Sequence, residues 1–376
     1  MLPGPRGDTP SLADVLTGAF AAMVGEPHRL NLAPVRSAAV LLVDGLGMSA
    51  LQRRAGHARR LLGAIPNTGG VIESGFPTTT ASALATLTTG LSAGEHGLVG
   101  YSVIDRAGDR VVNQLTGWDD AMTPAQWQPF ETVFERSAAR GIDAVVVGAE
   151  RYRDTGFTDA VLRGARFAPR VSIADRVAAG AELLRGSEQR LVYIYVPELD
   201  KAGHSHGVES ELWTARLEQL DAALAAFDTN LPADVGVLLT ADHGMLDIPP
   251  HRRLVFSADD PLWQGIRHVA GEPRCLHLGL DDPQQARAVR DRWRTAEGDR
   301  AWVVTREEAI DAHWFGAVSA AALPRIGDVI VAARAQVAYY DARTATARSL
   351  AMVGQHGSFS PEELRVPLAR WGAFSV

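Results

Sequence analysis

Apolar runs alternate with amphipathic segments along most of the chain. The runs at residues 37–43, 190–196 and 235–239 are continuously apolar and partly β-branched or aromatic, which is typical of strands buried on both faces of a sheet. Residues 173–185 and 212–227 have the apolar spacing of helices. Repeated strand–helix units predict an α/β fold, a three-layer sandwich with a mainly parallel central sheet.

Four other segments add less regular elements. Residues 48–62 are expected to form one helix with a solvated basic face. Residues 131–147 form a predicted helix–strand unit, and residues 103–112 predict a β-hairpin. Residues 150–170 carry scattered arginines without periodicity, which favours a surface loop. In the alternative interpretation, one of these arginines borders the active site and binds phosphate.

The pattern changes after Gly244, where prolines interrupt the strand–helix alternation. Short strands and one helix in this part suggest a small α+β unit. The predicted elements are residues 274–278, 284–294, 302–305 and 329–333. We therefore expect a catalytic α/β domain of residues 1–248 and 341–376, with an inserted α+β cap subdomain of residues 249–340.

Carboxylates and histidines follow several of the predicted strands. They are Asp44, Asp200, His204, Asp242 and His243, joined by His356 near the end of the chain. Because the carboxyl ends of parallel strands meet at one edge of a sheet, these side chains are expected to converge. Mixed nitrogen and oxygen ligands of this kind suit two adjacent zinc-type ions.

Three threonines, Thr78 to Thr80, precede an Ala- and Leu-rich segment that reads as a helix. A short strand at residues 70–74 leads into them, and Pro77 breaks it. Hydroxyls and unpaired N–H groups at a helix start favour an anion. A plain helix-capping role is the alternative, but the acidic and histidine motifs elsewhere in the chain favour a catalytic hydroxyl.

Together these motifs resemble the alkaline phosphatase superfamily and, within it, the type I phosphodiesterase/nucleotide pyrophosphatase family. The shared order is Asp-Gly, Thr with a later Thr-Gly, Asp-x-x-x-His, Asp-His-Gly and a late His-Gly, from Asp44 to His356. In the family pattern the nucleophilic threonine lies ten residues before the glycine of the Thr-Gly pair. Gly90 therefore selects Thr80 as the nucleophile.

The resemblance implies two divalent metal ions, with Zn²⁺ the favoured ion. It assigns one ion to Asp44, Asp242, His243 and Thr80. It assigns the other ion to Asp200, His204 and His356. A threonine activated in this way would attack phosphorus and form a phosphothreonine, which water then hydrolyses.

Two departures from the family pattern concern the substrate. Ala81 stands where relatives often have an aromatic residue, and Tyr101 stands where they often have asparagine. The stretch from Gly70 to Tyr101 contains no arginine, which favours diesters or pyrophosphates over the doubly charged monoesters. Substrate contacts are expected from Phe76, Tyr101 and Tyr195.

The predicted function is therefore metal-dependent hydrolysis of phosphodiester or pyrophosphate bonds in a small phosphate ester, nucleotides included. The alternatives are a phosphonoacetate hydrolase-like activity and a phosphomonoesterase activity at the same two-metal site. A metal-binding protein without turnover is disfavoured, because Thr80 and all the ligand motifs are intact.

Composition limits the partners and the location. The chain of 376 residues is 46% hydrophobic, with a net charge of −7 and a pI of about 5.9, which argues against a general nucleic-acid surface. No run approaches the roughly 18 apolar residues of a membrane span, and the N-terminus lacks a signal-peptide pattern. The single Cys275 fits a reducing compartment. We expect a cytoplasmic protein, and the sequence does not indicate its oligomeric state.

Overall fold

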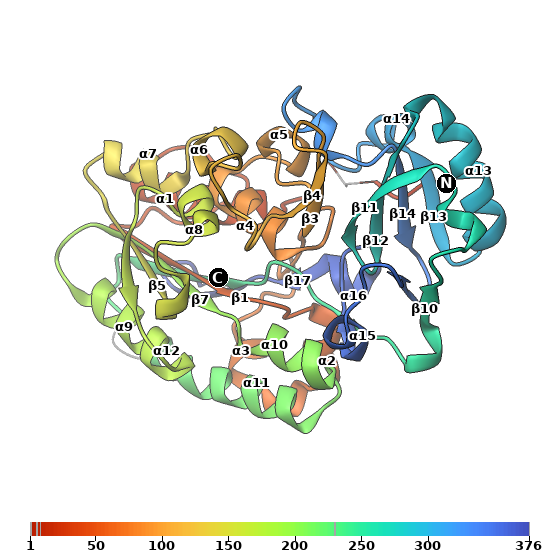
Figure 1. Cartoon of the computed structure of the whole chain (residues 1–376). Coiled ribbons are helices and arrows are strands. Elements are labelled where there is room, and N and C mark those ends of the chain that lie inside the picture. Colours follow the sequence, from red (N-terminus) through yellow and green to blue (C-terminus); the bar gives the residue numbers. More distant parts are fainter. Residues whose placement is uncertain (1, 5–6, 8, 229–230, 376) are drawn as a thin grey trace.

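A computed structural model of the chain describes residues 2–4, 7, 9–228 and 231–375. Within these ranges the largest sheet has the strand order β18-β8-β1-β7-β5-β6 (Figure 1). Neighbouring strands are parallel except for β18, which is antiparallel to β8. The strands are β1 (Ser37–Val43), β5 (Asp143–Gly148), β6 (Arg166–Pro169), β7 (Arg190–Val196), β8 (Val235–Thr240) and β18 (Ala369–Gly372). The prediction of an α/β fold with a mainly parallel sheet is confirmed.

Helices cover both faces of this sheet, which gives three layers (Figure 1). One side carries α1 (Ala13–Val24), α4 (Thr80–Thr89), α5 (Ala93–His96), α6 (Pro124–Trp127), α7 (Val133–Ala139) and α8 (Gly156–Val161). The other side carries α2 (Met48–Arg53), α3 (Arg59–Gly63), α9 (Ile173–Arg185), α10 (Glu198–His206), α11 (Glu211–Ala223) and α12 (Ala225–Asp228). Every residue of β1 and β8 is buried between the layers, as their apolar runs require.

A second sheet, antiparallel and four-stranded, lies at one end of the molecule (right in Figure 1). It contains β11 (Ile266–Glu272), β12 (Cys275–Leu280), β14 (Val329–Ala333) and β13 (Ala301–Thr305), with α13 (Ala286–Glu297) and α14 (Arg306–Asp311) beside it. Its core includes Trp263, Trp293 and Tyr339. The predicted α+β character of this part is observed, whereas the boundaries at residues 249 and 340 stay a prediction.

Four short strand pairs complete the sheets of the described part of the fold, and three of them link distant parts of the chain. They are β2 (Val71–Glu73) with β17 (Arg365–Pro367), β3 (Ser102–Asp105) with β4 (Arg110–Asn113), β9 (Leu246–Asp247) with β16 (Gly354–Gln355), and β10 (Arg253–Phe256) with β15 (Ala338–Asp341). The β3–β4 pair confirms the predicted hairpin. The remaining elements are η1 (Ala55–His57), η2 (Glu150–Tyr152), η3 (Pro250–Arg252), η4 (Pro261–Trp263), η5 (Pro283–Gln285), η6 (Leu323–Arg325), α15 (Ala347–Ala351) and α16 (Pro361–Leu364). No helix in the described ranges combines the length and the apolar character needed to cross a bilayer.

Two sequence predictions of local structure were wrong. Residues 48–62 form α2, η1 and the start of α3 instead of one helix. The first turn of α3 is held by a distant carboxylate, since Asp221 on α11 accepts hydrogen bonds from the backbone N–H groups of Arg60 and Leu61 at 3.4 and 2.8 Å. Residues 150–170 are not a plain loop, because they contain η2, α8 and the edge strand β6.

Buried His96 gives the fold a pH-sensitive point. Its Nδ1 accepts a hydrogen bond from the Leu98 N–H at 3.1 Å, and its Nε2 lies 3.0 Å from the Thr86 hydroxyl. A second proton on the ring would lie on Nδ1 and would face the Leu98 N–H, which is itself a donor. Burial, with the nearby Arg325 guanidinium, lowers the pKa of His96 to about 3.

A histidine whose folded pKa is depressed stabilises the fold above its unfolded value of about 6.5, and this contribution is lost as pH falls. We expect His96 to account for about 2 kcal/mol of lost unfolding free energy between pH 7 and pH 5. In His96→Asn, the amide oxygen retains an acceptor for Leu98, so this part of the pH dependence should vanish. Urea unfolding at both pH values measures it, and equal losses in the two proteins would contradict the assignment.

Candidate metal centre and active site

Three aspartates lie together at the carboxyl edge of the central sheet. Asp44 follows β1, Asp242 follows β8, and Asp200 lies on α10 directly after β7. These three strands are neighbours in the sheet, so the convergence expected from the sequence is observed. Gly45 permits it, because its φ is +76° and a Cβ at this position would lie 2.9 Å from the Asp200 Cα.

The three predicted histidines reach the same point from separate segments. His243 adjoins Asp242, and its ring stacks on that of His356 with centroids 3.7 Å apart. His356 follows β16, which pairs with β9 just beyond the Asp-His-Gly motif. His204 lies one helical turn after Asp200, with its Nε2 3.2 Å from the Asp200 Oδ1.

The Nδ1 of each of these histidines is hydrogen-bonded to a backbone carbonyl oxygen. The acceptors are Gly354 O for His204 at 2.9 Å, Gly244 O for His243 at 3.0 Å and Thr78 O for His356 at 2.7 Å. Because Nδ1–H donates, each Nε2 carries a lone pair that points into the site. The Nε2 atoms of His204 and His356 are only 3.2 Å apart, and two facing lone pairs are stabilised by a cation that both ligate.

The carboxylates leave oxygens free in the same space. Tyr195 donates its hydroxyl to Asp44 Oδ2, and the N–H groups of Gly45 and His243 donate to Asp242 Oδ1. Within the described ranges, Asp44 Oδ1, Asp200 Oδ1 and Asp242 Oδ2 are buried without a hydrogen-bond partner. Buried carboxylate oxygens of this kind are costly unless a cation binds them.

The pKa shifts report the same imbalance of charge. Burial raises the pKa of Asp44 well above its usual value, and the nearby Asp200 and Asp242 carboxylates raise it further. Burial lowers the pKa of His356 well below its usual value, with His243 and His204 adding to the shift. Burial acts in the same direction at Asp200 and His204, but their mutual attraction outweighs it, so the pKa of Asp200 is lowered and that of His204 is raised. Asp44 and His356 thus resist their charged forms, and a divalent cation would remove the conflict at Asp44.

The residues fit metal ions in two overlapping groups. Ligand atoms of Asp200, His204 and His356 lie within 4.8 Å of one another, as do those of Asp44, Asp200 and His243. Asp242 Oδ2 is 3.4 Å from His243 Nε2 and adjoins the second group. The predicted ligands are thus brought together, and Asp200 lies between the two groups.

Of the three threonines, Thr80 faces this centre. It is the first residue of α4, and its Oγ1 lies 3.2 Å from His243 Nε2. The Thr78 hydroxyl instead donates to Ser358 O at 2.8 Å and accepts from the Gly357 N–H at 3.0 Å. Thr79 occupies the N-cap position but makes no side-chain capping bond. Plain capping therefore does not explain these residues, and Thr80 is the one of the three whose hydroxyl meets the Asp/His cluster.

A cavity of about 460 Å³ opens beside Thr80. Its wall consists of Asp44, Thr80, Leu84, Leu115, Thr116, Arg151, Tyr152, Thr155, Phe157, Thr158, Leu162, Tyr193, Tyr195, Pro197, Asp200, Lys201 and Arg348. Among the predicted substrate contacts, only Tyr195 belongs to this wall. Phe76 is buried, stacked on Phe359 at 4.0 Å. Tyr101 is 42% exposed and outside the wall. Neither position supports the expected contact.

The sequence did not indicate Glu272, a buried carboxylate from the second sheet. Its Oε2 lies 3.8 Å from His356 Nδ1, and its side chain contacts Thr79. Burial raises its pKa well above the usual value. Glu272 sits in the tight β11–β12 connection and belongs to no spaced motif, so only the Gly-Glu-Pro turn marks it in the sequence. His206, by contrast, is exposed and contacts the Ser205 hydroxyl at 2.7 Å.

Comparison with known proteins agrees with this geometry. Residues 38–359 match the family of type I phosphodiesterases and nucleotide pyrophosphatases. The chain belongs to this family. It is therefore a phosphoester hydrolase of a metal-dependent family, with an Asp/His cluster suited to metal. No curated protein matches the chain.

Solved structures share the fold at low sequence identity. Murine ectonucleotide pyrophosphatase/phosphodiesterase 5 is 19% identical, with a TM-score of 0.67 over 89% of this chain and 87% of that one. An inactive variant of that murine protein was solved in complex with AMP. Phosphonoacetate hydrolase from Sinorhizobium meliloti, in complex with phosphonoacetate, is 18% identical, with a TM-score of 0.70 over 90% of this chain and 91% of that one.

Proposed function

We propose that the chain hydrolyses phosphodiester or pyrophosphate bonds at a centre of two divalent ions, with Zn²⁺ the favoured ion, through a phosphothreonine at Thr80. The main support is the position of the Thr80 hydroxyl, 3.2 Å from His243 Nε2 and at the start of α4. Further support comes from the buried carboxylate oxygens of Asp44, Asp200 and Asp242 that lack a hydrogen-bond partner among the described residues and could bind the ions.

The residues divide the chemistry between them. When bound, the divalent ions supply positive charge that favours an ionised Thr80 hydroxyl and an anionic leaving group. Thr80 Oγ1 forms a bond to phosphorus while the bond from phosphorus to the leaving oxygen breaks. The N–H groups at the start of α4 face the phosphoryl oxygens and stabilise their charge.

A second displacement restores the enzyme. Water attacks the phosphorus of the phosphothreonine, the bond from phosphorus to Thr80 Oγ1 breaks, and a proton of the water restores the Thr80 hydroxyl. Asp44 is oriented by the Tyr195 hydroxyl, and the three histidines are oriented by their Nδ1 contacts to backbone carbonyls. These contacts keep the ligand atoms in place through both steps.

The phosphonoacetate hydrolase-like alternative uses the same residues on a C–P bond, and the phosphomonoesterase alternative uses them on a dianion. The fold shared with a phosphonoacetate hydrolase keeps the first alternative open. Within the described ranges, the two arginines of the cavity wall, Arg151 and Arg348, are exposed, and the lack of a buried arginine in this wall disfavours the dianion. The cytoplasmic location and the domain boundaries at 248/249 and 340/341 remain predictions.

A panel of substrates tests the proposal. The purified chain, after metal analysis, is given bis(p-nitrophenyl) phosphate, p-nitrophenyl phosphate, a dinucleoside pyrophosphate and phosphonoacetate. We expect about two bound divalent ions per chain, with the diester and pyrophosphate turned over fastest. Chelation should abolish turnover, and added Zn²⁺ should restore it. Turnover that survives complete metal removal, or a preference for the monoester or phosphonoacetate, would contradict the proposal.

A further inference from the structure

The wall of the cavity beside Thr80 combines proposed catalytic side chains, apolar side chains and exposed cations. Asp44, Thr80 and Asp200 belong to the proposed catalytic centre. Aromatic and aliphatic side chains form much of the rest of the wall. They are Leu84, Leu115, Tyr152, Phe157, Leu162, Tyr193 and Tyr195. Three cationic side chains complete the wall, and its only carboxylates are the two predicted metal ligands.

A series of contacts connects the metal centre to these cations. Tyr195 donates to Asp44, and its ring meets the Tyr152 ring edge-on at 5.4 Å. The Arg151 guanidinium lies 4.8 Å from the centroid of the Tyr152 ring, and the Lys201 Nζ lies 5.5 Å from it. Two tyrosine rings therefore separate Asp44 from two positive charges.

The three cations come from separate elements, and all are exposed. Arg151 lies on η2, Lys201 on α10 and Arg348 on α15. Within the described ranges, none of them has a carboxylate as ion-pair partner. Other arginines near this wall are compensated, since Arg153 pairs with Glu150 at 3.1 Å and Arg163 pairs with Glu135 at 3.0 Å. Converging, uncompensated cations attract an anion to the mouth of the cavity.

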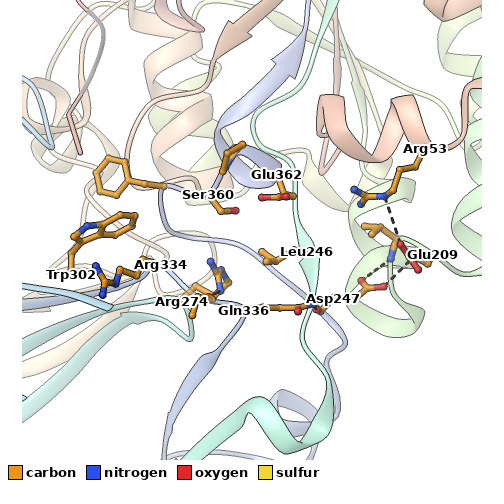
Figure 2. Close-up of a pocket in the computed structure, with 14 residues that line it drawn as sticks. Arg53, Glu209, Leu246, Asp247, Arg274, Trp302, Arg334, Gln336, Ser360 and Glu362 are labelled. Carbon is orange, nitrogen blue, oxygen red and sulfur yellow. Dashed lines mark hydrogen bonds and ion pairs between the residues drawn. The ribbon is translucent and has the colours of Figure 1, made fainter. Parts of the chain in front are cut away.

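A second cavity, of about 510 Å³, provides a contrast (Figure 2). Its wall also carries arginines, namely Arg53, Arg274 and Arg334, but three carboxylates share it. These are Glu209, Asp247 and Glu362. Arg53 pairs with Glu209 at 3.6 Å, and Arg274 pairs with the buried Glu363. Each arginine of that cavity has a carboxylate partner, since Arg334 lies 4.0 Å from Asp299. The unpaired cations beside Thr80 are therefore not a general property of the surface.

We propose that the substrate carries a second anionic group, a carboxylate or a phosphate, beyond an apolar or planar part, and that Arg151, Lys201 and Arg348 bind this group. The inference rests on the proposed phosphoester hydrolysis and names the substrate class of that site. The scissile phosphorus lies at Thr80, the planar part lies against Tyr152 and Tyr195, and the second anion reaches the mouth of the cavity.

Matched esters test the charge directly. p-Nitrophenyl phenyl phosphate is prepared with a para-carboxylate, a para-phosphate or a neutral para-carboxamide on the phenyl ring. We expect kcat/KM to favour the charged esters over the carboxamide by roughly tenfold at low salt, because each exposed ion pair is worth about two- to fivefold. The preference should shrink as salt rises. Of the two charged esters, the one with the higher kcat/KM identifies the natural group as a carboxylate or a phosphate.

Charge-neutral variants locate the effect. Lys201→Met, Arg151→Gln and Arg348→Gln should each lower the ratio of charged to neutral kcat/KM, and the triple variant should bring it close to one. Arg59→Gln, an exposed arginine outside the cavity wall, is the matched control and should leave the ratio intact. A wild-type ratio near one, or a triple variant that keeps the preference, would overturn the inference.

Lys201 also permits a chemical test, since it is the only lysine of the chain. Carbamylation removes its charge, whereas reductive methylation keeps it. Only carbamylation should lower the ratio of charged to neutral kcat/KM. Both reagents also modify the N-terminal amine, so Lys201→Arg treated in the same way measures that effect alone. Equal effects of the two reagents would contradict a role for charge.

Binding separates this inference from the proposed function. Calorimetry on metal-loaded Thr80→Ala compares the charged esters with the carboxamide when no turnover is needed. Tighter binding of the charged esters, lost in the triple variant, supports the inference even where the wild type fails to hydrolyse them. Equal binding of all three overturns it even where hydrolysis is observed.

Discussion

Thr80→Ala is expected to lower kcat by a factor on the order of 10⁴ or more, the usual scale for removal of a nucleophile. The metal content should stay at the wild-type level, because each proposed ion keeps three protein ligands besides Thr80. The comparison of kcat with elemental analysis therefore separates loss of the nucleophile from loss of the site. Substantial turnover by a metal-loaded Thr80→Ala protein would contradict the role of Thr80.

The neighbouring threonines supply the controls. Thr79→Val and Thr78→Val remove hydroxyls of similar burial from the same turn. The Thr78 hydroxyl makes two hydrogen bonds to the segment after His356. Removal of this hydroxyl should therefore lower the unfolding free energy by about 1–3 kcal/mol. Both variants should keep most of the turnover. Thr80→Ser retains the hydroxyl and should keep part of it.

Phosphopeptide mapping provides the direct readout. Substrate is quenched with acid during turnover, and the digest is searched for a phosphorylated peptide. Phosphate is expected on Thr80 in the wild type and on no peptide in Thr80→Ala. Phosphate on Thr78, Thr79 or Ser82 would show that the spacing to Gly90 selects the wrong residue.

The edge of the sheet where the Asp and His side chains meet could be predicted because its determinants are local. The continuous apolar runs before Asp44, Asp200 and Asp242 predict buried strands. Parallel strands place their carboxyl ends together at one edge of the sheet. The helix at Ile173–Arg185 and the strand at Arg190–Val196 have the predicted bounds. The helix starts with a capping box of Ser172 and Asp175, which is a signal within four residues.

The elements that sequence reasoning missed depend on distant partners. The start of α3 is held by Asp221, some 160 residues later in the chain. The edge strand β6 (Arg166–Pro169) is short, contains a proline and is recognisable only when paired with β5. The strand β18 (Ala369–Gly372) likewise joins the sheet only through its antiparallel pairing with β8.

The cavity beside Thr80 was the least predictable part for the same reason. Its mouth joins Arg151, Lys201 and Arg348, which lie up to about two hundred residues apart and share no motif. The sequence pointed instead to Phe76, as part of an apolar wall, and to Tyr101, by its distance from Thr80 along the chain. Phe76 turns into the core formed with Trp314 and Phe359, because the second sheet supplies an apolar surface there. Spacing along a sequence locates ligands on strand ends but not side chains on loops.

Replacing a metal ligand should have an effect of similar size to the loss of Thr80, but with a different signature. His204→Ala removes a ring whose Nε2 faces both His356 and Asp200. We expect kcat/KM to fall by more than about 100-fold, which is the upper end for substitutions that only orient a ligand. About one equivalent of metal should be lost as well, since two of the three ligands in that group remain.

His206→Ala is the matched control, two residues further along the same helix. His206 is exposed, and its only side-chain hydrogen bond among the described residues is with the Ser205 hydroxyl. A surface substitution of this kind should change the unfolding free energy by less than about 0.5 kcal/mol and leave kcat/KM and metal content at the wild-type values. Since both variants remove an imidazole from α10, the difference between them measures ligation alone. Equal, mild losses in the two variants, with full metal content in both, would refute His204 as a ligand and leave the pair Asp200 and His356 too few to hold an ion.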